Sequence, residues 1–315
     1  MVSSPLNSAE RLGRGAPPQA RRQTLHSRSA IVKRWLTTLS KHAVLIFFGV
    51  FFILPLIWML TTALKTDPEV LRYPPTLLPA TPIWQNFPDA FNFVPFATYV
   101  RNSLWVSFTS VVGTLVSCTL AAYGFSRLEW KGRDVLFILV LSTLMLPYQV
   151  TMVPLYVLFN SIGWVNTLNP LIIPHFFGNA FFIFLLRQFF LGIPKDLSDA
   201  AVMDGCSDLR ILWSVILPLA RPALMVVTLF QFLSSWNDFL TPLIYLNDKE
   251  LFTISLGLAT MRSAYGLSRF SLIMAATSLF VVPVIVLFFF AQKVTAYHFY
   301  GKCGKLSLWL SNCRK

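Results

Sequence analysis

Acidic and amide side chains gather at two places in a chain that is otherwise rich in hydrocarbon. One is the segment 193–222, IPKDLSDAAVMDGCSDLRILWSVILPLARP, which holds four aspartates: Asp196, Asp199, Asp204 and Asp208. The other is the pair Asn237 and Asp238, which interrupts a later apolar run. Carboxylates act as bases, nucleophiles or metal ligands only when partner groups of matching type cluster with them. No such cluster is visible in the sequence, so we expect a chain that is not an enzyme.

The other residues with chemical potential are scattered. The cysteines and histidines share no zinc-ligand spacing and lie at Cys118, Cys206, Cys303, Cys313, His26, His42, His175 and His298. We expect His175, inside an apolar run, to bond to a neighbouring helix. The phosphate-binding pattern GxxxxGK[ST] is absent, because YGKCGKL and WKGRD lack its spacing. Energy from ATP would therefore have to come through another chain.

The composition is that of a membrane protein. Hydrophobic residues make up 55% of the chain and charged residues 12%, against about a quarter charged in soluble proteins. Runs without Asp, Glu, Lys or Arg cover 43–64, 102–126, 135–186 and 270–292, and a spanning helix needs about 20 apolar residues. The longest run must fold back at the turn residues between Asn160 and Pro170. The sequence predicts an all-α membrane protein with six transmembrane helices: 43–64, 102–126, 135–158, 170–190, 223–246 and 270–292.

Most of the 26 Lys and Arg residues fall on one side of this topology. They lie before residue 43, between residues 126 and 135, in and beside the segment 193–222, and after residue 292. The positive-inside rule then places both termini and that segment in the cytoplasm of a multi-pass protein of the cell membrane. Anionic lipid headgroups explain the basic charge without a nucleic-acid partner. We expect residues 1–42 to be a disordered basic arm and 294–315 to form a cytoplasmic tail.

The segment 193–222 has the pattern of two short helices joined by a tight turn. Pro194 suits a first helical turn, and Asp196 and Asp199 lie near the positive end of that helix dipole. One face of this helix has small residues at its centre, which let another surface approach closely: Leu197, Ala200, Ala201 and Asp204. Gly205 is expected to end the helix in the left-handed conformation, and Ser207 to cap the next helix. That helix carries an apolar stripe, Leu209, Leu212, Trp213 and Ile216, before Pro218 and Pro222 turn the chain back.

Two roles fit this pattern equally well: an interfacial hairpin at the membrane boundary, or a docking surface. The stretch LSDAAVMDGCSDLRILWSVILPLARPAL resembles the EAA loop of the membrane subunits of bacterial ABC importers. That loop reads Glu-Ala-Ala, then Gly after three intervening residues, then a distal Leu-Pro. Asp199 stands where the family usually has glutamate, which keeps the charge and shortens the reach. The resemblance implies docking on an ATPase through these residues: Asp199, Ala200, Ala201, Asp204, Gly205, Leu209, Leu217 and Pro218.

The resemblance extends over roughly 83–293. The stretches NFPDAFNFVPFATYVRNSLWVS, LMLPYQVTMVPLYVLF, FFIFLLRQFFLGIPKDL and WNDFLTPLIY are similar to the shorter permease subunit of maltose-type sugar importers. This implies a type I ABC importer permease fold and transport of a sugar, or of a related polyol or glycerol-phosphate compound. The implied partners are a second permease subunit, an ATPase dimer that holds ATP and magnesium, and an extracellular or periplasmic solute-binding protein. No cofactor is implied in this chain. The tail after Lys293 departs from the family pattern, so no tail contact is carried over.

Asn237 and Asp238 allow two interpretations, because an ionisable group inside a span usually faces a pathway or a partner. They contact sugar hydroxyls on the translocation path, or they make an interhelical hydrogen bond that fixes a gate. The second is favoured, because the resemblance implies a sugar held mainly by the partner permease. Two other functions stay open. An ion-driven secondary transporter would show charge pairs or paired broken helices, and an ABC importer permease could also carry a solute that is not a sugar.

Overall fold

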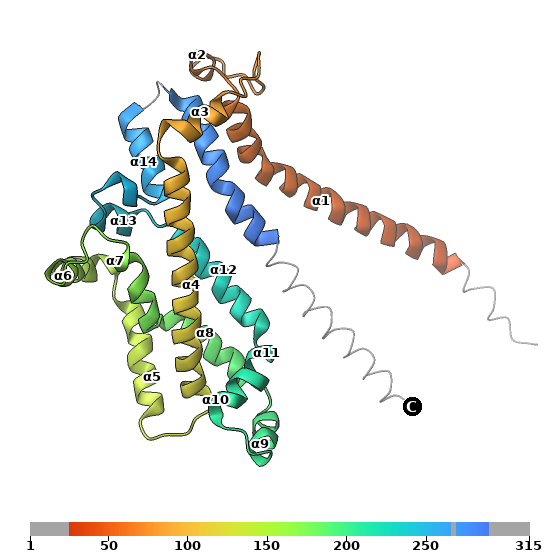
Figure 1. The fold of residues 1–315 in the computed structure, drawn as a ribbon. Helices are drawn as coiled ribbons and strands as arrows, with labels where there is room; N and C mark the ends of the chain where they lie inside the picture. The colour runs from red at the N-terminus through yellow and green to blue at the C-terminus, as the bar shows by residue number, and fades with distance from the viewer. Residues whose placement is uncertain (1–24, 266–268, 290–315) are drawn as a thin grey trace, which may run out of the picture. The chain divides into compact units, whose positions relative to one another are not determined.

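The chain is helical throughout the part that the structure describes. The computed structural model describes residues 25–265 and 269–289, and these contain helices, turns and loops but no strand (Figure 1). The chain divides into two compact units, the first ending at Trp58 and the second beginning at Met59. Every candidate site residue belongs to the second unit. The expected tail, 294–315, lies outside the described residues.

Helices and helical turns follow one another in chain order. Their bounds are α1 Leu25–Ala63, α2 Asp67–Val70, α3 Asn86–Phe93, α4 Phe96–Ser126, α5 Arg133–Ser142, η1 Thr143–Met145, α6 Tyr148–Ser161, α7 Asn169–Ile172, η2 Ile173–Phe177, α8 Ala180–Leu191, α9 Lys195–Met203, α10 Asp208–Ile211, η3 Leu212–Ile216, α11 Leu217–Leu219, α12 Arg221–Asn237, α13 Leu240–Tyr245, η4 Lys249–Leu251 and α14 Ile254–Tyr265. A last helix covers Phe270–Phe289. Within the described residues, four helices are long and apolar enough to cross a membrane, or up to six if each of two bent pairs is one span.

Helix α1 begins well before the first predicted span. Residues 25–42, expected as part of a disordered arm, are helical, whereas residues 1–24 lie outside the described part of the chain. The stretch 25–42 contains neither Gly nor Pro, so nothing in it stops a helix that continues into an apolar span. Its apolar portion, Trp35–Ala63, has a mean hydropathy of 2.7 over its most apolar window.

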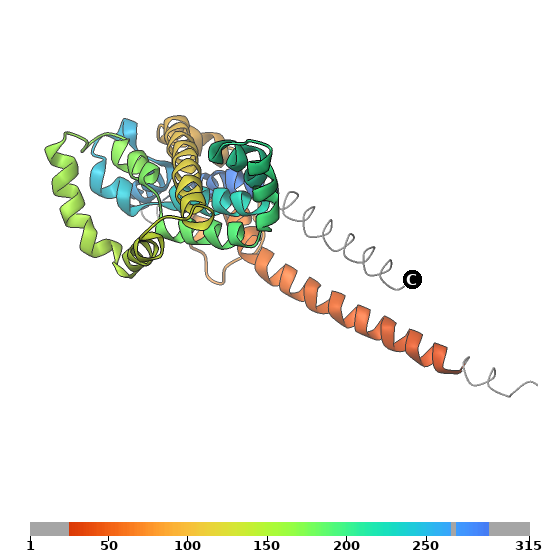
Figure 2. The same ribbon diagram turned by 90° about the horizontal axis from the view of Figure 1, so that it is seen from below.

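Helix α4 is the centre of the second unit (Figures 1 and 2). It packs against α8, α12, η2 and α14. Many of its buried positions carry small side chains, among them Ser103, Ser107, Ser110, Gly113, Thr114 and Cys118. Small residues let helix backbones approach closely inside a membrane, where the hydrophobic effect does not drive helices together. Gly113 marks one close approach, because a Cβ there would lie 2.6 Å from the ring of Phe176 in η2.

The segment predicted as the span 135–158 is a bent pair of helices and not a continuous helix. The segment Arg133–Met145 meets Tyr148–Ser161 at 97°, and Figure 1 shows α6 end-on beside the upright α5. Pro147 lies at the break, and Leu146 before it is extended, with φ −83° and ψ 114°. Proline has no N–H and disfavours the helical conformation of the residue before it.

The predicted span 223–246 is also interrupted. Helix α12 ends at Asn237 and α13 begins at Leu240, because Asp238 between them has an extended backbone, with φ −65° and ψ 119°. On the other side of α12, the segment Asp208–Leu219 meets Arg221–Asn237 at 81°. The chain therefore turns sharply where the segment 193–222 leads into the fifth span.

Candidate functional site

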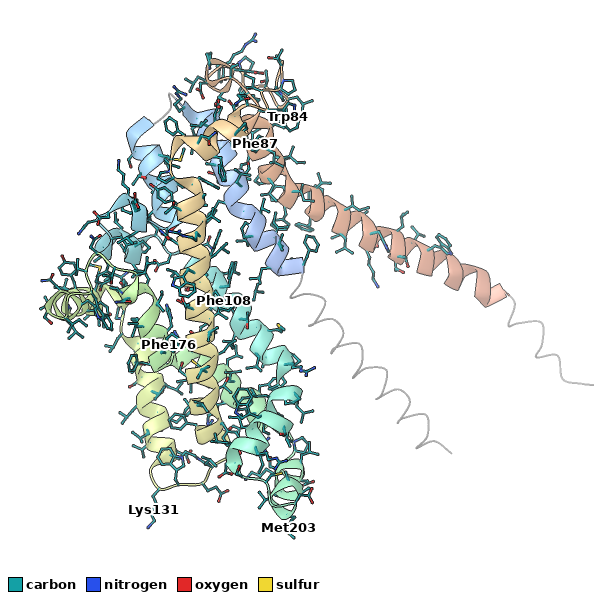
Figure 3. The ribbon with its side chains drawn as sticks, viewed as in Figure 1. Trp84, Phe87, Phe108, Lys131, Phe176 and Met203 are labelled. Atoms are coloured by element: carbon teal, nitrogen blue, oxygen red, sulfur yellow. The ribbon has the colours of Figure 1, made fainter. Side chains whose placement is uncertain are left out.

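Helix α9 projects from one end of the second unit. It contains no buried residue, and the side chain of Met203 at its last position is 87% exposed. Figure 3 places Met203 and Lys131 at the same end of this unit, opposite Trp84 and Phe87. A helix without a fully buried residue contributes little to the core of its own subunit. Ala201 packs against that core, and the exposed side chains of α9 are available to a partner.

The acids and alanines of α9 lie on this accessible surface. Asp199 and Ala200 are exposed, and Ala201 is half-buried. Asp196 occupies the first turn, as predicted, whereas Asp199 falls beyond it. The dipole of the helix therefore favours the charge of Asp196 and acts little on Asp199, because the effect fades after the first turn. The charge of Asp199 is left for a contact outside the helix.

Gly205 makes the turn that the sequence predicts. Its φ is +78°, its N–H bonds to the carbonyl of Val202 at 2.9 Å, and the N–H of Cys206 bonds to the carbonyl of Ala201 at 3.0 Å. These two bonds form a Schellman motif, which ends a helix with a left-handed residue. No heavy atom lies within 4 Å of a Cβ built on Gly205, so only the backbone conformation restricts this position.

The second helix of the segment differs from the predicted one. Ser207 occupies the N-cap position with an extended backbone, but its side chain makes no capping hydrogen bond. The predicted stripe is split: Leu212 and Ile216 are 1% and 0% exposed, whereas Leu209 and Trp213 are 61% and 67% exposed. The buried face is formed by Ile211, Leu212 and Ile216, so Leu209 and Trp213 fall outside it, and the turn over Leu212–Ile216 is π-helical. Leu209 therefore belongs to the accessible surface with α9.

The Leu-Pro pair near the end of the segment is followed by a tight turn. Leu217 and Pro218 lie in α11, where Leu217 is half-buried and Pro218 exposed. The N–H of Ala220 bonds to the carbonyls of Ile216 and Leu217 at 2.9 and 3.1 Å, and α12 begins at the next residue. This tight turn produces the 81° change of direction into the span.

Asn237 and Asp238 lie at the break between α12 and α13, and their side chains bond to the backbone there. The Oδ1 of Asp238 accepts the N–H of Thr241 at 3.2 Å, and the hydroxyl of Ser255 donates to the backbone carbonyl of Asp238 at 2.5 Å. Asn237 donates from Nδ2 to the carbonyl of Leu233 in its own helix at 2.9 Å. The carboxylate thus caps α13 in the manner of an N-terminal aspartate, and the interhelical bond from α14 goes to the backbone.

A second polar group lies deeper in the bundle. His175 Nδ1 in η2 is 3.3 Å from Gln231 Nε2 in α12, and Gln231 Nε2 donates to Ser235 Oγ at 2.9 Å. His175 therefore bonds to a neighbouring helix, as the sequence predicts. Sequence reasoning missed Gln231, although an amide within the apolar run of α12 is itself a signal of an interhelical contact. The structure brings η2 and α12 together here, and it does not bring Asn237 or Asp238 to the segment 193–222.

Substitution of Asp238 distinguishes its two interpretations. We expect Asp238→Asn to leave expression and sugar affinity unchanged, because the amide oxygen of asparagine also caps a helix well. Asp238→Ala removes the cap and should cost about 0.5–2 kcal/mol of stability, measured as a lower apparent Tm of the purified protein. Selective loss of affinity for one sugar in Asp238→Asn, with normal expression, would place this carboxylate on the sugar path instead.

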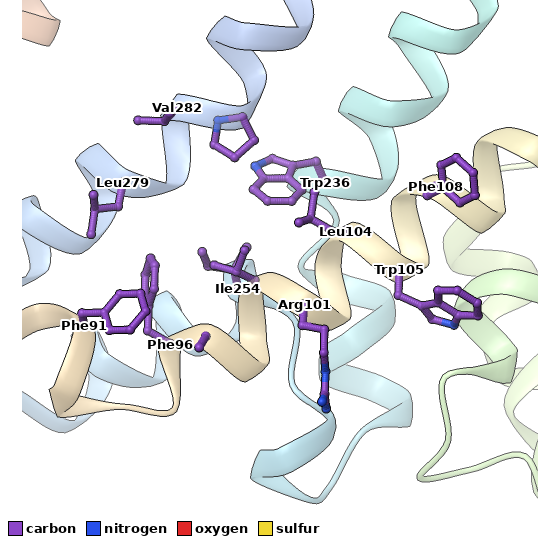
Figure 4. A pocket seen from close by; sticks show the side chains of 13 residues that line it. Phe91, Phe96, Arg101, Leu104, Trp105, Phe108, Trp236, Ile254, Leu279 and Val282 are labelled. Atoms are coloured by element: carbon purple, nitrogen blue, oxygen red, sulfur yellow. The ribbon is translucent and has the colours of Figure 1, made fainter.

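A separate apolar groove of 720 Å³ lies against α3, α4, α12, α14 and the last helix (Figure 4). Phe96, Leu104, Trp236 and Leu279 line it, and Arg101 is the charged residue at its edge. None of the candidate site residues lines this groove. A hydrocarbon surface with one cation lacks the converging hydrogen-bond donors and acceptors that a polar solute needs, so the groove does not have the features of a site for a polar solute.

Comparison with known proteins decides the family. Residues 113–296, more than half of the chain, match the family model of the binding-protein-dependent transport system inner membrane component. The chain belongs to this family. It is 35% identical over 262 residues to the arabinooligosaccharides transport system permease protein AraQ of Halalkalibacterium halodurans, covering 82% of this chain and 92% of that protein.

Other members of the family are similar at comparable levels. Identity is 31% to the diacetylchitobiose uptake system permease protein DasC of Streptomyces coelicolor, over 80% of this chain and 90% of the relative. Identity is 30% to the trehalose/maltose transport system permease protein MalG of Thermococcus litoralis, over 84% of this chain and 95% of the relative. A crystal structure of a bacterial ABC transporter that imports the acidic polysaccharide alginate matches with a TM-score of 0.71 at 24% identity, over 83% of this chain and 97% of that one. The importer permease fold predicted from the sequence is confirmed.

Proposed function

We propose that this chain is the membrane-spanning permease subunit of an ABC importer that carries an oligosaccharide or related compound across the cell membrane. The relatives named for arabinooligosaccharide, diacetylchitobiose and trehalose/maltose transport support the sugar class. The chain itself is a non-catalytic subunit in this proposal, and ATP and magnesium belong to a partner ATPase. The observation that carries the proposal is α9, an accessible helix of acid and small residues ended by the left-handed Gly205.

The chain works with three kinds of partner. A second permease subunit completes the pathway, an ATPase dimer receives α9, and a solute-binding protein delivers the sugar. A similar alginate transporter has been crystallised with an alginate-bound periplasmic protein, with a TM-score of 0.59 to this chain. Closure of the ATPase dimer on ATP would displace α9 and shift the permease between its inward-open and outward-open states. A bound nucleotide biases a two-state element in this way without any chemistry in the permease.

The end of the second unit that carries α9 is the cytoplasmic end in this proposal. Lys131 and Met203 lie together at this end (Figure 3), and it also carries Arg127, Arg133 and Lys195. Basic residues in short loops face the cytoplasm by the positive-inside rule. The same rule places both termini in the cytoplasm.

Co-purification tests the docking role. We expect the tagged permease, expressed with the ATPase and second permease of the same organism, to retain the ATPase through purification. Ala200→Trp should abolish this retention, because a bulky ring on the accessible face of α9 blocks close approach. Lys131→Trp is the matched control, since it adds the same ring at the same end but outside α9, and it should retain the ATPase. Retention in Ala200→Trp would remove α9 from the ATPase contact.

The energy source separates this function from an ion-driven transporter. The structure does contain two bent helix pairs in its described residues, a feature expected of secondary transporters, so the test is needed. We expect uptake of one sugar from a panel of arabinooligosaccharides, diacetylchitobiose, maltose and trehalose into proteoliposomes that hold the full complex. Uptake should require internal ATP and the binding protein, and an ionophore should leave it unchanged. Uptake driven by an ion gradient without ATP would refute the importer.

A further inference from the structure

Two arginines at the end that carries α9 each bind the backbone of the other's helix. Arg127, directly after α4, donates from Nη2 to the carbonyls of Phe190 and Ile193 at 2.5 and 2.6 Å. Arg187, on α8, donates from Nε to the carbonyl of Phe125 at 3.0 Å. Phe125 and Phe190 lie in the last turns of α4 and α8, where carbonyls lack the regular helical N–H partner four residues on; the Phe190 carbonyl also accepts the N–H of Ile193 at 3.1 Å. Each cation therefore satisfies the negative end of the opposite helix.

Both arginines are held in place by their surroundings. The side chain of Arg187 is 15% exposed, and its guanidinium lies 4.1 Å from the centre of the Phe137 ring. Burial lowers the pKa of the Arg127 guanidinium, while the nearby charge of Asp199 acts in the opposite direction. By contrast, Lys195 pairs with Glu129 at 3.5 Å with both side chains largely exposed, which contributes little.

Arg127 binds both sides of the link between α8 and α9. Phe190 lies in the last turn of α8, and Ile193 directly precedes Pro194, the N-cap residue of α9. Gly192 lies between the two carbonyls that accept from Arg127. A link that contains glycine would otherwise allow α9 to swing relative to α8, so the arginine removes the flexibility of this connection.

Further contacts join α4 to the chain of α7, η2 and α8 inside the bundle. Each is a polar contact between the two elements: Ser110 Oγ to the Leu171 carbonyl at 3.2 Å, Ser117 Oγ to the His175 carbonyl at 3.1 Å, and the Asn179 N–H to Cys118 Sγ at 3.3 Å. The pair α4 and α8 is thus connected at its end by the arginines and along its length by these bonds. His175 then contacts Gln231 of α12.

We propose that Arg127 and Arg187 are positioning residues that form a crossed clamp and make the end of α4, the end of α8 and the start of α9 one rigid body. The inference rests on the proposed function, in which an ATPase displaces α9. With the clamp in place, that displacement moves α4 and α8 and reaches the contact between His175 and Gln231. Without it, the displacement is absorbed by the residues between α8 and α9.

Distances between spin labels test the rigid body directly, without any sugar. Labels on Leu120→Cys in α4 and Asp196→Cys in α9 occupy exposed positions, in a complex whose native cysteines are replaced by serine. We expect one narrow distance distribution that is the same without nucleotide and with ATP and vanadate. Arg127→Gln should broaden it in both states. A change of more than about 2 Å between the states of the parent complex, the size of an ordinary helix shift at an interface, would overturn the clamp.

Coupled transport gives the second readout. We expect Arg127→Gln to assemble with the ATPase and hydrolyse ATP, but to import roughly tenfold less sugar per ATP, the usual size of a coupling term. Arg127→Lys should restore part of the loss, because ammonium also donates to two carbonyls. The double variant with Arg187→Gln should be no worse than either single variant, as residues of one unit are not additive. Glu129→Gln, which removes a charge from the exposed pair with Lys195 but lies outside α9, is the control and should behave as the parent.

Each result decides for or against the clamp. Parent-like uptake per ATP in Arg127→Gln, in a parent complex that itself imports sugar, overturns the clamp and leaves the proposed function intact. A parent complex without ATP-dependent uptake refutes the proposed function, and the label distances then judge the clamp alone. Failure of both Arg127→Gln and Arg127→Lys to assemble also overturns it, because arginine would then be a requirement of folding.

Discussion

Gly205→Val is expected to separate ATP hydrolysis from transport. Valine at a φ of +78° costs about 1–2 kcal/mol, which corresponds to roughly a fivefold to thirtyfold loss of the native turn. The Schellman bonds from Gly205 and Cys206 would break, and α10 would leave α9 in a different direction. We expect the complex to reach the membrane and to hydrolyse ATP. Sugar uptake should fall by the same factor as the population of the native turn. Uptake and hydrolysis are measured together in proteoliposomes.

Gly205→Asn is the matched control for that substitution. Asparagine adopts the left-handed conformation more readily than other residues that have a side chain, and no atom lies within 4 Å of the Cβ position. Transport should therefore be largely retained in Gly205→Asn. Equal loss of transport in the valine and asparagine variants would mean that the side chain blocks a partner surface, and equal retention would mean that the turn is dispensable.

Gly257→Ala is expected to give the largest loss of stability among single-methyl substitutions. A Cβ on Gly257 in α14 would lie 2.3 Å from a ring carbon of Tyr99 in α4, and Tyr99 is only 2% exposed. The ring cannot move away without displacing Phe252, whose ring centre is 6.2 Å from it. Overpacking of this kind costs about 1–3 kcal/mol, which should appear as a lower apparent Tm of the purified complex.

Gly124→Ala provides the comparison, because Gly124 lies in α4 and no atom surrounds its Cβ position within 4 Å. Alanine is a better helix former than glycine by about 1 kcal/mol, so this variant should match or exceed the parent in Tm. The double variant Gly257→Ala and Tyr99→Leu should recover part of the loss, since leucine lacks the ring carbons that clash. A Tm of Gly257→Ala equal to that of the parent would show that α4 and α14 separate at no cost.

Local patterns predicted the local structure well. The turn at Gly205 and the helix before it follow from a few adjacent residues, namely a proline at the start, small residues in the middle and a glycine at the end. The same holds for α4: it ends at Ser126, where the predicted span 102–126 ends, and it begins six residues before that span, at Phe96. In each case the residues that predict the element lie within the element itself or within a few positions of it.

Features that depend on distant residues or on small differences in backbone geometry were not predicted. A proline inside an apolar run fits both a slight kink and the 97° break seen at Pro147, and the sequence offers no criterion between them. The buried face of the second helix of the segment includes Ile211 and not Leu209, and the π-helical turn η3 that follows has no recognisable sequence signal. The bond from Arg127 to Phe190 joins residues 63 positions apart, so it becomes visible only when α4 and α8 lie side by side.

The accessibility of α9 has a consequence for how such a subunit changes over time. None of its nine residues is fully buried in the permease, so substitutions at its exposed positions leave the packing of the transmembrane helices intact, whereas Ala201 packs against the core. The helix can adapt to a different ATPase while the bundle keeps its own sequence, and the bundle can diversify for new sugars while α9 stays constant. The proposed ATPase contact and the packing of the membrane bundle therefore depend on largely different residues of one chain. Exchange of the exposed positions of Lys195–Met203 together with Leu209 is the smallest change expected to pair this permease with another ATPase.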